Sequence, residues 1–154
     1  MSTFAIRLAL AGIAGILSLT VSAEANAPAG RYTTTGVIGT VYDTKTKLTW
    51  LQTVPAASYT WAEAKTYCES PIVSYNFGGL AWRLPTVKEL MTIVDYSQAV
   101  APLIDPTFPE TPADVFWSST PLAAGTSIAW YVDFNNGSVN YTNAGSGHYI
   151  RCVH

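Results

Sequence analysis

Residues 82–90, Trp-Arg-Leu-Pro-Thr-Val-Lys-Glu-Leu, are the stretch of this sequence that says most about its fold. Thr86 and Glu89 have the spacing of a capping box, in which each side chain accepts a hydrogen bond from the backbone N–H of the other residue. The apolar side chains that follow recur at helical spacing: Val87, Leu90, Met91 and Val94. We therefore expect a short helix to begin after Thr86 and to be stabilised by docking this stripe on a sheet.

The same arrangement occurs earlier in the chain. Thr60 and Glu63 have the spacing of a second capping box. The apolar side chains of one helical face follow: Trp61, Ala64 and Cys68. This pattern predicts another short helix, which ends before Pro71.

Other segments are rich in Thr, Val and aromatic residues and are predicted to be strands. They lie at residues 40–42, 48–50, 116–119, 128–134, 138–142 and 149–153. Asn136-Gly137 is typical of a two-residue hairpin, because both residues tolerate positive φ. Residues 97–115 contain four prolines and predict a long loop. The order of elements predicts an α+β fold, with two short helices packed on one antiparallel sheet.

The composition narrows the class of protein. The formal net charge is −2, 12% of the residues are charged and 49% are hydrophobic. Because no cluster of Lys and Arg could neutralise several phosphates, we expect no nucleic-acid partner. The hydrophobic fraction excludes a disordered chain, and the length of 154 residues fits one domain.

The N-terminal residues have the pattern of a targeting segment. One positive charge precedes the apolar run 8–21, and Ala23-Glu24-Ala25 supplies small residues for cleavage. Residues 1–25 are therefore predicted to be a signal peptide, 26–30 a short linker and 31–154 the mature domain. An uncleaved membrane anchor is the alternative, but the run is shorter than the roughly 20 residues that span a bilayer. We expect the mature domain to be secreted, periplasmic or at the cell surface, without membrane association after cleavage.

Cys68 and Cys152 are the only cysteines. In an oxidising compartment each has only the other to pair with, so we expect a disulfide. The loop that it closes is long, and the chain-entropy model gives a stabilisation of about 4 kcal/mol. The alternative is a pair of buried free thiols.

Five separated blocks occur in order along residues 31–154: Val41-Tyr42-Asp43, Leu48-Thr49-Trp50, residues 82–90, residues 117–120 and residues 130–134. This series resembles the Lcl C-terminal domain family of exported bacterial domains, some of which end collagen-like adhesins. Residues 60–68 are also similar to the first helix of the C-type lectin-like fold, in which a helix cysteine bonds to one in the last strand. The resemblance implies that fold and, for members on adhesins, attachment to sulfated polysaccharide.

Candidate metal and catalytic residues are few. Asp105, Glu110 and Asp114 could supply oxygens to Ca²⁺, but the sequence triplets of calcium-dependent C-type lectins are missing. His148 and His154 are the only histidines, and neither has an acid at metal-ligand spacing. No Gly-x-Ser-x-Gly motif occurs. We expect no cofactor, with Ca²⁺ as the alternative, and no catalytic residue.

The most suggestive recognition surface is the polar, nearly uncharged segment 131–149. Tyr, Asn and Ser combine rigid aromatic area with adaptable hydrogen bonding. Strand alternation assigns Trp130, Val132 and Phe134 to the core and leaves Tyr131 exposed. The candidate ligand-binding residues are Tyr131, Asn135, Asn136, Asn140, Tyr141, Asn143 and His148.

These features predict an exported, non-catalytic binding module that recognises a surface glycan or a protein ligand, with a role in adhesion. One alternative is a structural subunit of a surface or pilus-like assembly, and a homo-oligomer stays open. Another is an enzyme of the formylglycine-generating type, because Arg83-Leu84-Pro85-Thr86 also resembles part of that fold. Such an enzyme requires reactive cysteines, whereas Cys68 and Cys152 are expected to be bonded to each other.

Overall fold

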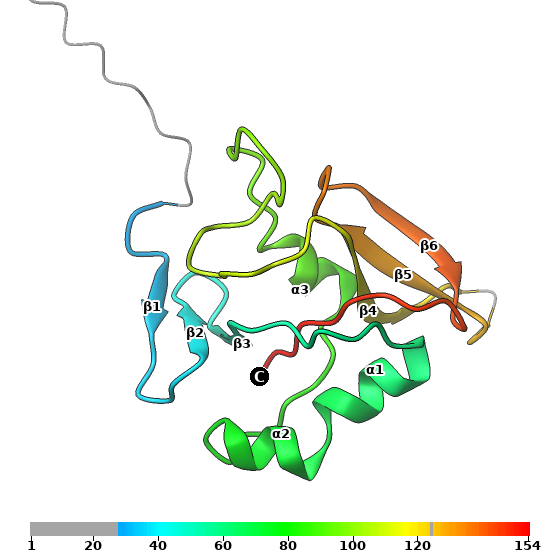
Figure 1. The fold of residues 1–154 in the computed structure, drawn as a ribbon, viewed down its shortest axis with the longest axis horizontal. Helices are drawn as coiled ribbons and strands as arrows, with labels where there is room; N and C mark the ends of the chain where they lie inside the picture. The colour runs from blue at the N-terminus through cyan, green and yellow to red at the C-terminus, as the bar shows by residue number, and fades with distance from the viewer. Residues whose placement is uncertain (1–27, 124) are drawn as a thin grey trace, which may run out of the picture.

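Two three-stranded antiparallel sheets and three short helices make up the described part of the computed structural model (Figure 1). The model describes residues 28–123 and 125–154. The predicted α+β class is confirmed at this level. The predicted signal peptide, residues 1–25, and the start of the linker lie outside the described residues.

The first sheet contains β1 (Tyr32–Thr34), β2 (Thr40–Asp43) and β3 (Leu48–Leu51) in that order. The predicted hairpin of β2 and β3 is confirmed, and Val41 pairs with Trp50. Both of these side chains are buried. The register of the hairpin therefore contributes an apolar cross-strand pair to the core.

The second sheet contains β4 (Val115–Pro121), β5 (Ile128–Asp133) and β6 (Val139–Asn143) in that order, which leaves β6 at the edge. The expectation of one antiparallel sheet is wrong, because residues 149–153 are not a strand of it. The Trp117 N–H donates to the Tyr149 carbonyl.

Residues 149–153, which we call the closing segment, also form hydrogen bonds outside the second sheet. The Leu51 N–H donates to the Cys152 carbonyl, and Arg83 and Val153 exchange two backbone hydrogen bonds of 2.9 Å. Because its bonds are divided among β4, β3 and the stretch 82–90, the segment joins the two sheets and extends neither.

The helices are α1 (Trp61–Cys68), α2 (Pro71–Asn76) and α3 (Val87–Met91). Both predicted capping boxes are confirmed, at the starts of α1 and α3. The expectation of two helices is wrong, because α2 begins at Pro71. Ser70 caps α2, and proline suits a first helical position, where its missing N–H needs no partner.

α3 is shorter than its apolar stripe predicts. The helix ends at Met91, whose side chain is 45% exposed. Ile93, beyond the helix, is buried instead. The chain leaves the helix because Val94 forms a β-bridge with Ile104 of the long loop.

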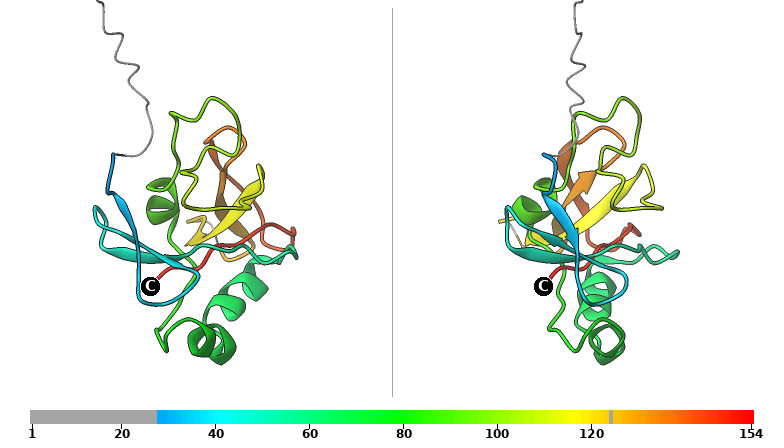
Figure 2. Two further views of the ribbon diagram at one scale, coloured as in Figure 1. Left: turned by 60° about the vertical axis from the view of Figure 1, so that its left-hand side comes forward. Right: turned by 90° about the vertical axis from the view of Figure 1, so that its left-hand side faces the viewer.

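α1 and α2 lie together at one end of the molecule, and the loop between α3 and β4 lies at the opposite end (Figure 2). This loop, residues 92–114, includes all of the predicted long loop except Val115, which begins β4. Arg151, which is fully buried, donates to the carbonyls of Leu51 and Gln52 and to Thr111 Oγ1 of the loop. The loop is thus tied to the closing segment.

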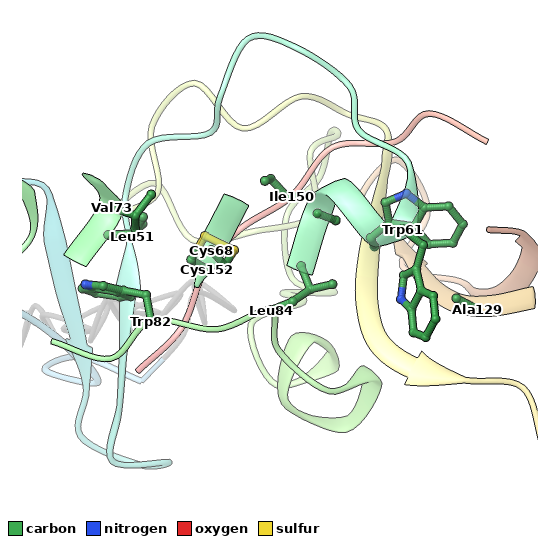
Figure 3. Close-up of a cluster of buried hydrophobic side chains, with 11 residues drawn as sticks. Leu51, Trp61, Cys68, Val73, Trp82, Leu84, Ala129, Ile150 and Cys152 are labelled. Atoms are coloured by element: carbon green, nitrogen blue, oxygen red, sulfur yellow. A yellow bond between two sulfur atoms is a disulfide. The ribbon is translucent and has the colours of Figure 1, made fainter. Parts of the chain in front are cut away.

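Two clusters of buried side chains form the core. The first surrounds the Cys68–Cys152 disulfide and includes Trp61, Trp82 and Leu84 (Figure 3). The second lies between the sheets, α3 and the long loop: Val41, Trp50, Leu90, Ile93, Ile104, Phe108, Phe116, Val132, Phe134 and Val153. The stretch 82–90 contributes Leu84 to one cluster and Leu90 to the other, which explains why it is so informative.

The predicted disulfide is confirmed, with the two Cα atoms 5.5 Å apart. It joins α1 to the closing segment, 84 residues away. Four tryptophans are buried: Trp50, Trp61, Trp82 and Trp117. Trp130 is only half-buried, and its ring contacts Tyr141 at a centroid distance of 5.2 Å.

Candidate functional site

The residues predicted to bind a ligand do not form one patch. Register pairs Tyr131 with Asn140 and Trp130 with Tyr141. Because neighbouring residues of a strand point to opposite faces, Asn140 and Tyr141 lie on different sides of the sheet. Asn135 and Asn136 lie at the β5–β6 turn, Asn143 is the last residue of β6, and His148 lies beyond that strand.

The β5–β6 turn differs from the predicted two-residue hairpin. The Asp133 N–H donates to the Ser138 carbonyl, so residues 134–137 form the loop. Gly137 has a φ of +74°, whereas Asn136 is not among the described residues with positive φ. A Cβ atom at Gly137 would also collide with the ring of Tyr96.

Several of the predicted asparagines have a local structural role. The side-chain oxygens of Asn136, Asn140 and Asn143 accept backbone N–H groups of Ser138, Tyr141 and Gly145, each at 2.8 Å. The bonds of Asn136 and Asn143 reach two residues on and form Asx turns, which stabilise the hairpin and its exit, whereas the bond of Asn140 reaches only the next residue. These amide oxygens are therefore already occupied, although Asn135, Asn136, Asn140 and Asn143 are all exposed.

Tyr131 and His148 lie together but are half-buried, so the expectation of an exposed Tyr131 is wrong. The His148 ring lies 4.6 Å from Trp117 and 5.7 Å from Tyr131, measured between ring centroids. Burial lowers the pKa of His148, and Asp114 opposes this shift. Both faces of β5 are covered, because Tyr131 packs on the first cluster while Val132 belongs to the second.

An open groove of about 490 Å³ lies beside α1, on a surface that the sequence did not single out. Its walls include the rings of Tyr59 and Tyr67, whose centroids are 5.1 Å apart at an angle of 52°. We call this site the α1 groove. It is lined by Ser58, Tyr59, Ala62, Glu63, Thr66 and Tyr67.

The α1 groove follows from the way α1 is docked. Trp61, Ala64 and Cys68 are buried, so the opposite helical face points outward. Tyr59 is fixed beside that face by two backbone hydrogen bonds with His148, of 2.9 and 3.0 Å. The indole N–H of Trp117 also donates to the Tyr59 carbonyl at 2.8 Å. The first wall of the groove is therefore held rigidly.

Glu63 supplies the negative charge of the α1 groove. Its Oε2 accepts hydrogen bonds from the backbone N–H and the hydroxyl of Thr60, at 2.9 and 2.7 Å. These bonds lower the pKa of Glu63, so its carboxylate is ionised at neutral pH. Burial raises the pKa of Tyr59, whose phenol therefore stays neutral.

The acids considered for Ca²⁺ are engaged separately. Asp105 accepts from the Thr107 N–H, and Asp114 accepts from the Val115 N–H. A second, smaller pocket of about 270 Å³ in the long loop contains Asp105 and Glu110 but not Asp114. In residues 28–123 and 125–154, no three His, Cys, Asp or Glu side chains are grouped to hold a metal ion.

Arg83, in the stretch 82–90, is paired with a carboxylate. Its two terminal nitrogens donate to the two oxygens of Glu89 at 2.8 and 2.7 Å. His154, at the C-terminus, has its Nδ1 3.1 Å from the Ala81 carbonyl. Within the described chain, neither group lines the α1 groove.

The geometry defines a small disulfide-linked α+β domain with an open aromatic groove beside its first helix. The model of the Lcl C-terminal domain family matches residues 39–154. The chain belongs to this family, which confirms the resemblance seen in the sequence. No curated protein matches the chain. Among the described helices, none has the length and apolar character needed to cross a bilayer.

The α1 groove was not predicted from the sequence, although the sequence contains a signal for it. Ala62 and Thr66, and likewise Glu63 and Tyr67, are four residues apart and share a helical face. The small Ala62 lies on a face that otherwise carries long or polar side chains, so it leaves a hollow. The position of Tyr59 beside this hollow depends on its pairing with His148, far away in the sequence.

Proposed function

We propose that the chain is an exported, non-catalytic module that binds a glycan in the α1 groove. The observation that carries the proposal is the pair of Tyr59 and Tyr67 rings, 5.1 Å apart, beside the Glu63 carboxylate. Tyrosine rings offer flat apolar area to the C–H faces of a sugar. The carboxylate and the hydroxyls of Ser58 and Thr66 can hydrogen-bond to sugar hydroxyls.

The size of the α1 groove favours a glycan over a folded protein ligand. Six residues of the described part of the chain line it, whereas a stable protein interface uses about 20–30 residues on each side. A concave site with few polar groups around an apolar floor is typical of small-molecule recognition.

The disulfide supports the export and the non-catalytic part of the proposal. Disulfides persist in oxidising compartments, which agrees with a secreted, periplasmic or cell-surface protein. Both cysteines are used in it, and an enzyme of the formylglycine-generating type would need them as reactive thiols. The link from α1 to the closing segment is also the arrangement expected of a C-type lectin-like fold.

A structural subunit of a surface or pilus-like assembly is the second candidate. It is favoured by the edge position of β6 and by exposed apolar side chains on α2, Ile72 and Tyr75. An unpaired strand edge can accept a strand of another chain. Size-exclusion chromatography with light scattering tests this candidate, and a strict monomer contradicts it.

A glycan array followed by calorimetry on the purified protein tests the leading proposal. We expect at least one glycan to bind without added calcium. Tyr67→Ala should weaken binding about tenfold or more, because stacking on an aromatic ring is lost. Tyr141→Ala, which removes an exposed tyrosine that does not line the α1 groove, is the matched control and should bind normally. Equal loss in both variants, or no bound glycan, contradicts the proposal.

A further inference from the structure

We infer that the glycan bound in the α1 groove carries free amino groups, as in an oligomer of unacetylated glucosamine. This inference rests on the proposed glycan-binding function and adds the charge of the ligand to it. It follows from the negative charge on the wall of the groove and from the lack of a positive charge among the described residues that line it.

Of the described residues that line the α1 groove, Glu63 alone carries a charge. Its Oε2 holds the cap of α1 through Thr60, while within the described chain no hydrogen bond to its Oε1 is found. A protonated amine could donate to Oε1 without disturbing the cap. Hydrogen bonds between two charged groups are about twice as strong as neutral ones.

The two tyrosine rings favour the same ligand. The faces of neutral phenols carry partial negative charge and attract cations within about 6 Å of the ring centre. Tyr59 and Tyr67 stand close enough together, with ring centroids 5.1 Å apart, for one sugar to contact both rings. An amino sugar has an apolar C–H face for one ring and an ammonium group for the carboxylate.

The cations near the α1 groove do not reverse this preference. Lys65 is on the same helix, but its ammonium lies over the buried ring of Trp61, 3.6 Å from the centroid. Arg83 is paired with Glu89, and Arg151 is fully buried. A sulfated or carboxylated sugar in the groove would therefore face Glu63 without a lining cation to compensate.

Calorimetry with three ligands at about pH 6, where the carboxylate is ionised, tests the inference. The ligands are a glucosamine oligomer, the N-acetylglucosamine oligomer of the same length, and heparin. We expect the glucosamine oligomer to bind about tenfold more tightly than the acetylated one, because an amide lacks the charge. We expect no binding of heparin in the α1 groove.

Glu63→Gln is the decisive variant, because glutamine also completes a capping box and so preserves the start of α1. This variant should bind the glucosamine oligomer and the N-acetylglucosamine oligomer with the same affinity. Glu89→Gln is the matched control: it changes the other capping glutamate, which does not line the groove. It should keep the tenfold preference.

The outcomes separate the two proposals. If the acetylated oligomer binds as tightly as the amino oligomer and Tyr67→Ala weakens both, the charge inference is overturned and the glycan site stands. If neither oligomer nor any other glycan binds, both proposals fail. Should Glu63→Gln not fold, wild-type binding in about 1 M salt replaces it, where screening should remove the preference for the amine.

Discussion

α1 and α3 both begin with a capping box, but the two capping glutamates have different surroundings. The N-cap threonine N–H donates to the glutamate at 2.9 Å in α1, from Thr60 to Glu63, and at 2.8 Å in α3, from Thr86 to Glu89. Glu89 is additionally gripped by both terminal nitrogens of Arg83. Glu63 has no such partner among residues 28–123 and 125–154, and it lines the α1 groove.

This difference shows what a local motif determines and what it leaves to tertiary contacts. The capping box sets where each helix begins. Arg83 neutralises one carboxylate and lowers the pKa of Glu89 to about 2, which makes that end of α3 part of the scaffold. The other carboxylate remains available to a ligand.

The largest expected effect concerns the disulfide, which ties α1 to the closing segment and has no counterpart on α3. Cys68→Ala should lower the free energy of unfolding by about 4 kcal/mol, because the denatured chain regains the freedom of a long loop. Urea denaturation measures this loss. Cys152→Ala should lose the same amount, and a loss below about 1 kcal/mol in both variants would contradict the structural role of the disulfide.

The two capping glutamates should differ in their contribution to stability. Glu89→Gln should lower the free energy of unfolding by about 1 kcal/mol, because it breaks a partly exposed bidentate ion pair while preserving the cap. Glu63→Gln should lower the urea midpoint less than Glu89→Gln does, because it removes a carboxylate charge but breaks no ion pair between described residues. Equal midpoints for the two variants would mean that the Arg83–Glu89 pair does not distinguish the helices.

The stability contributed by Glu89 should depend on pH. The pKa of Glu89 falls from its usual 4.5 to about 2 on folding, so the ionised form is favoured in the folded state. Its stabilisation is full above pH 4.5 and disappears as the pH falls toward 2. The difference in unfolding free energy between wild type and Glu89→Gln should shrink over this range. A difference that is constant with pH would contradict a stabilising role of the ionised Glu89 carboxylate.

The smallest effects are expected at the β5–β6 hairpin. Tyr141 is 48% exposed and touches mainly Trp130, so Tyr141→Ala should cost about 0.5 kcal/mol. Asn136→Ala should be similarly mild, since it removes one turn hydrogen bond. Thermal unfolding measures both. Unfolding of either variant at room temperature would show that the hairpin belongs to the scaffold.

Local signals predicted much of the fold. The two capping boxes located the starts of α1 and α3, and segments rich in Thr, Val and aromatic residues located the hairpin of β2 and β3. The disulfide followed from the cysteine count and the expected compartment. Ser70-Pro71 also signals a helix start, but Pro71 was interpreted only as the end of the preceding helix.

Features that depend on distant contacts were harder to predict. Residues 149–153 have strand-like composition, but they divide their hydrogen bonds between two sheets. Tyr131 was expected to be exposed because alternation cannot show that both faces of β5 are covered. The α1 groove requires Tyr59 to be held by His148, a pairing that no local pattern reveals.

Chemical-shift mapping by NMR is the sharpest test of glycan binding in the α1 groove. A glucosamine oligomer is added to the isotope-labelled protein, and the amide shifts are followed. We expect the largest changes at residues 58–67, around Tyr59, Glu63 and Tyr67. Changes confined to residues 135–143 of the hairpin, with residues 58–67 unaffected, would contradict binding in the α1 groove.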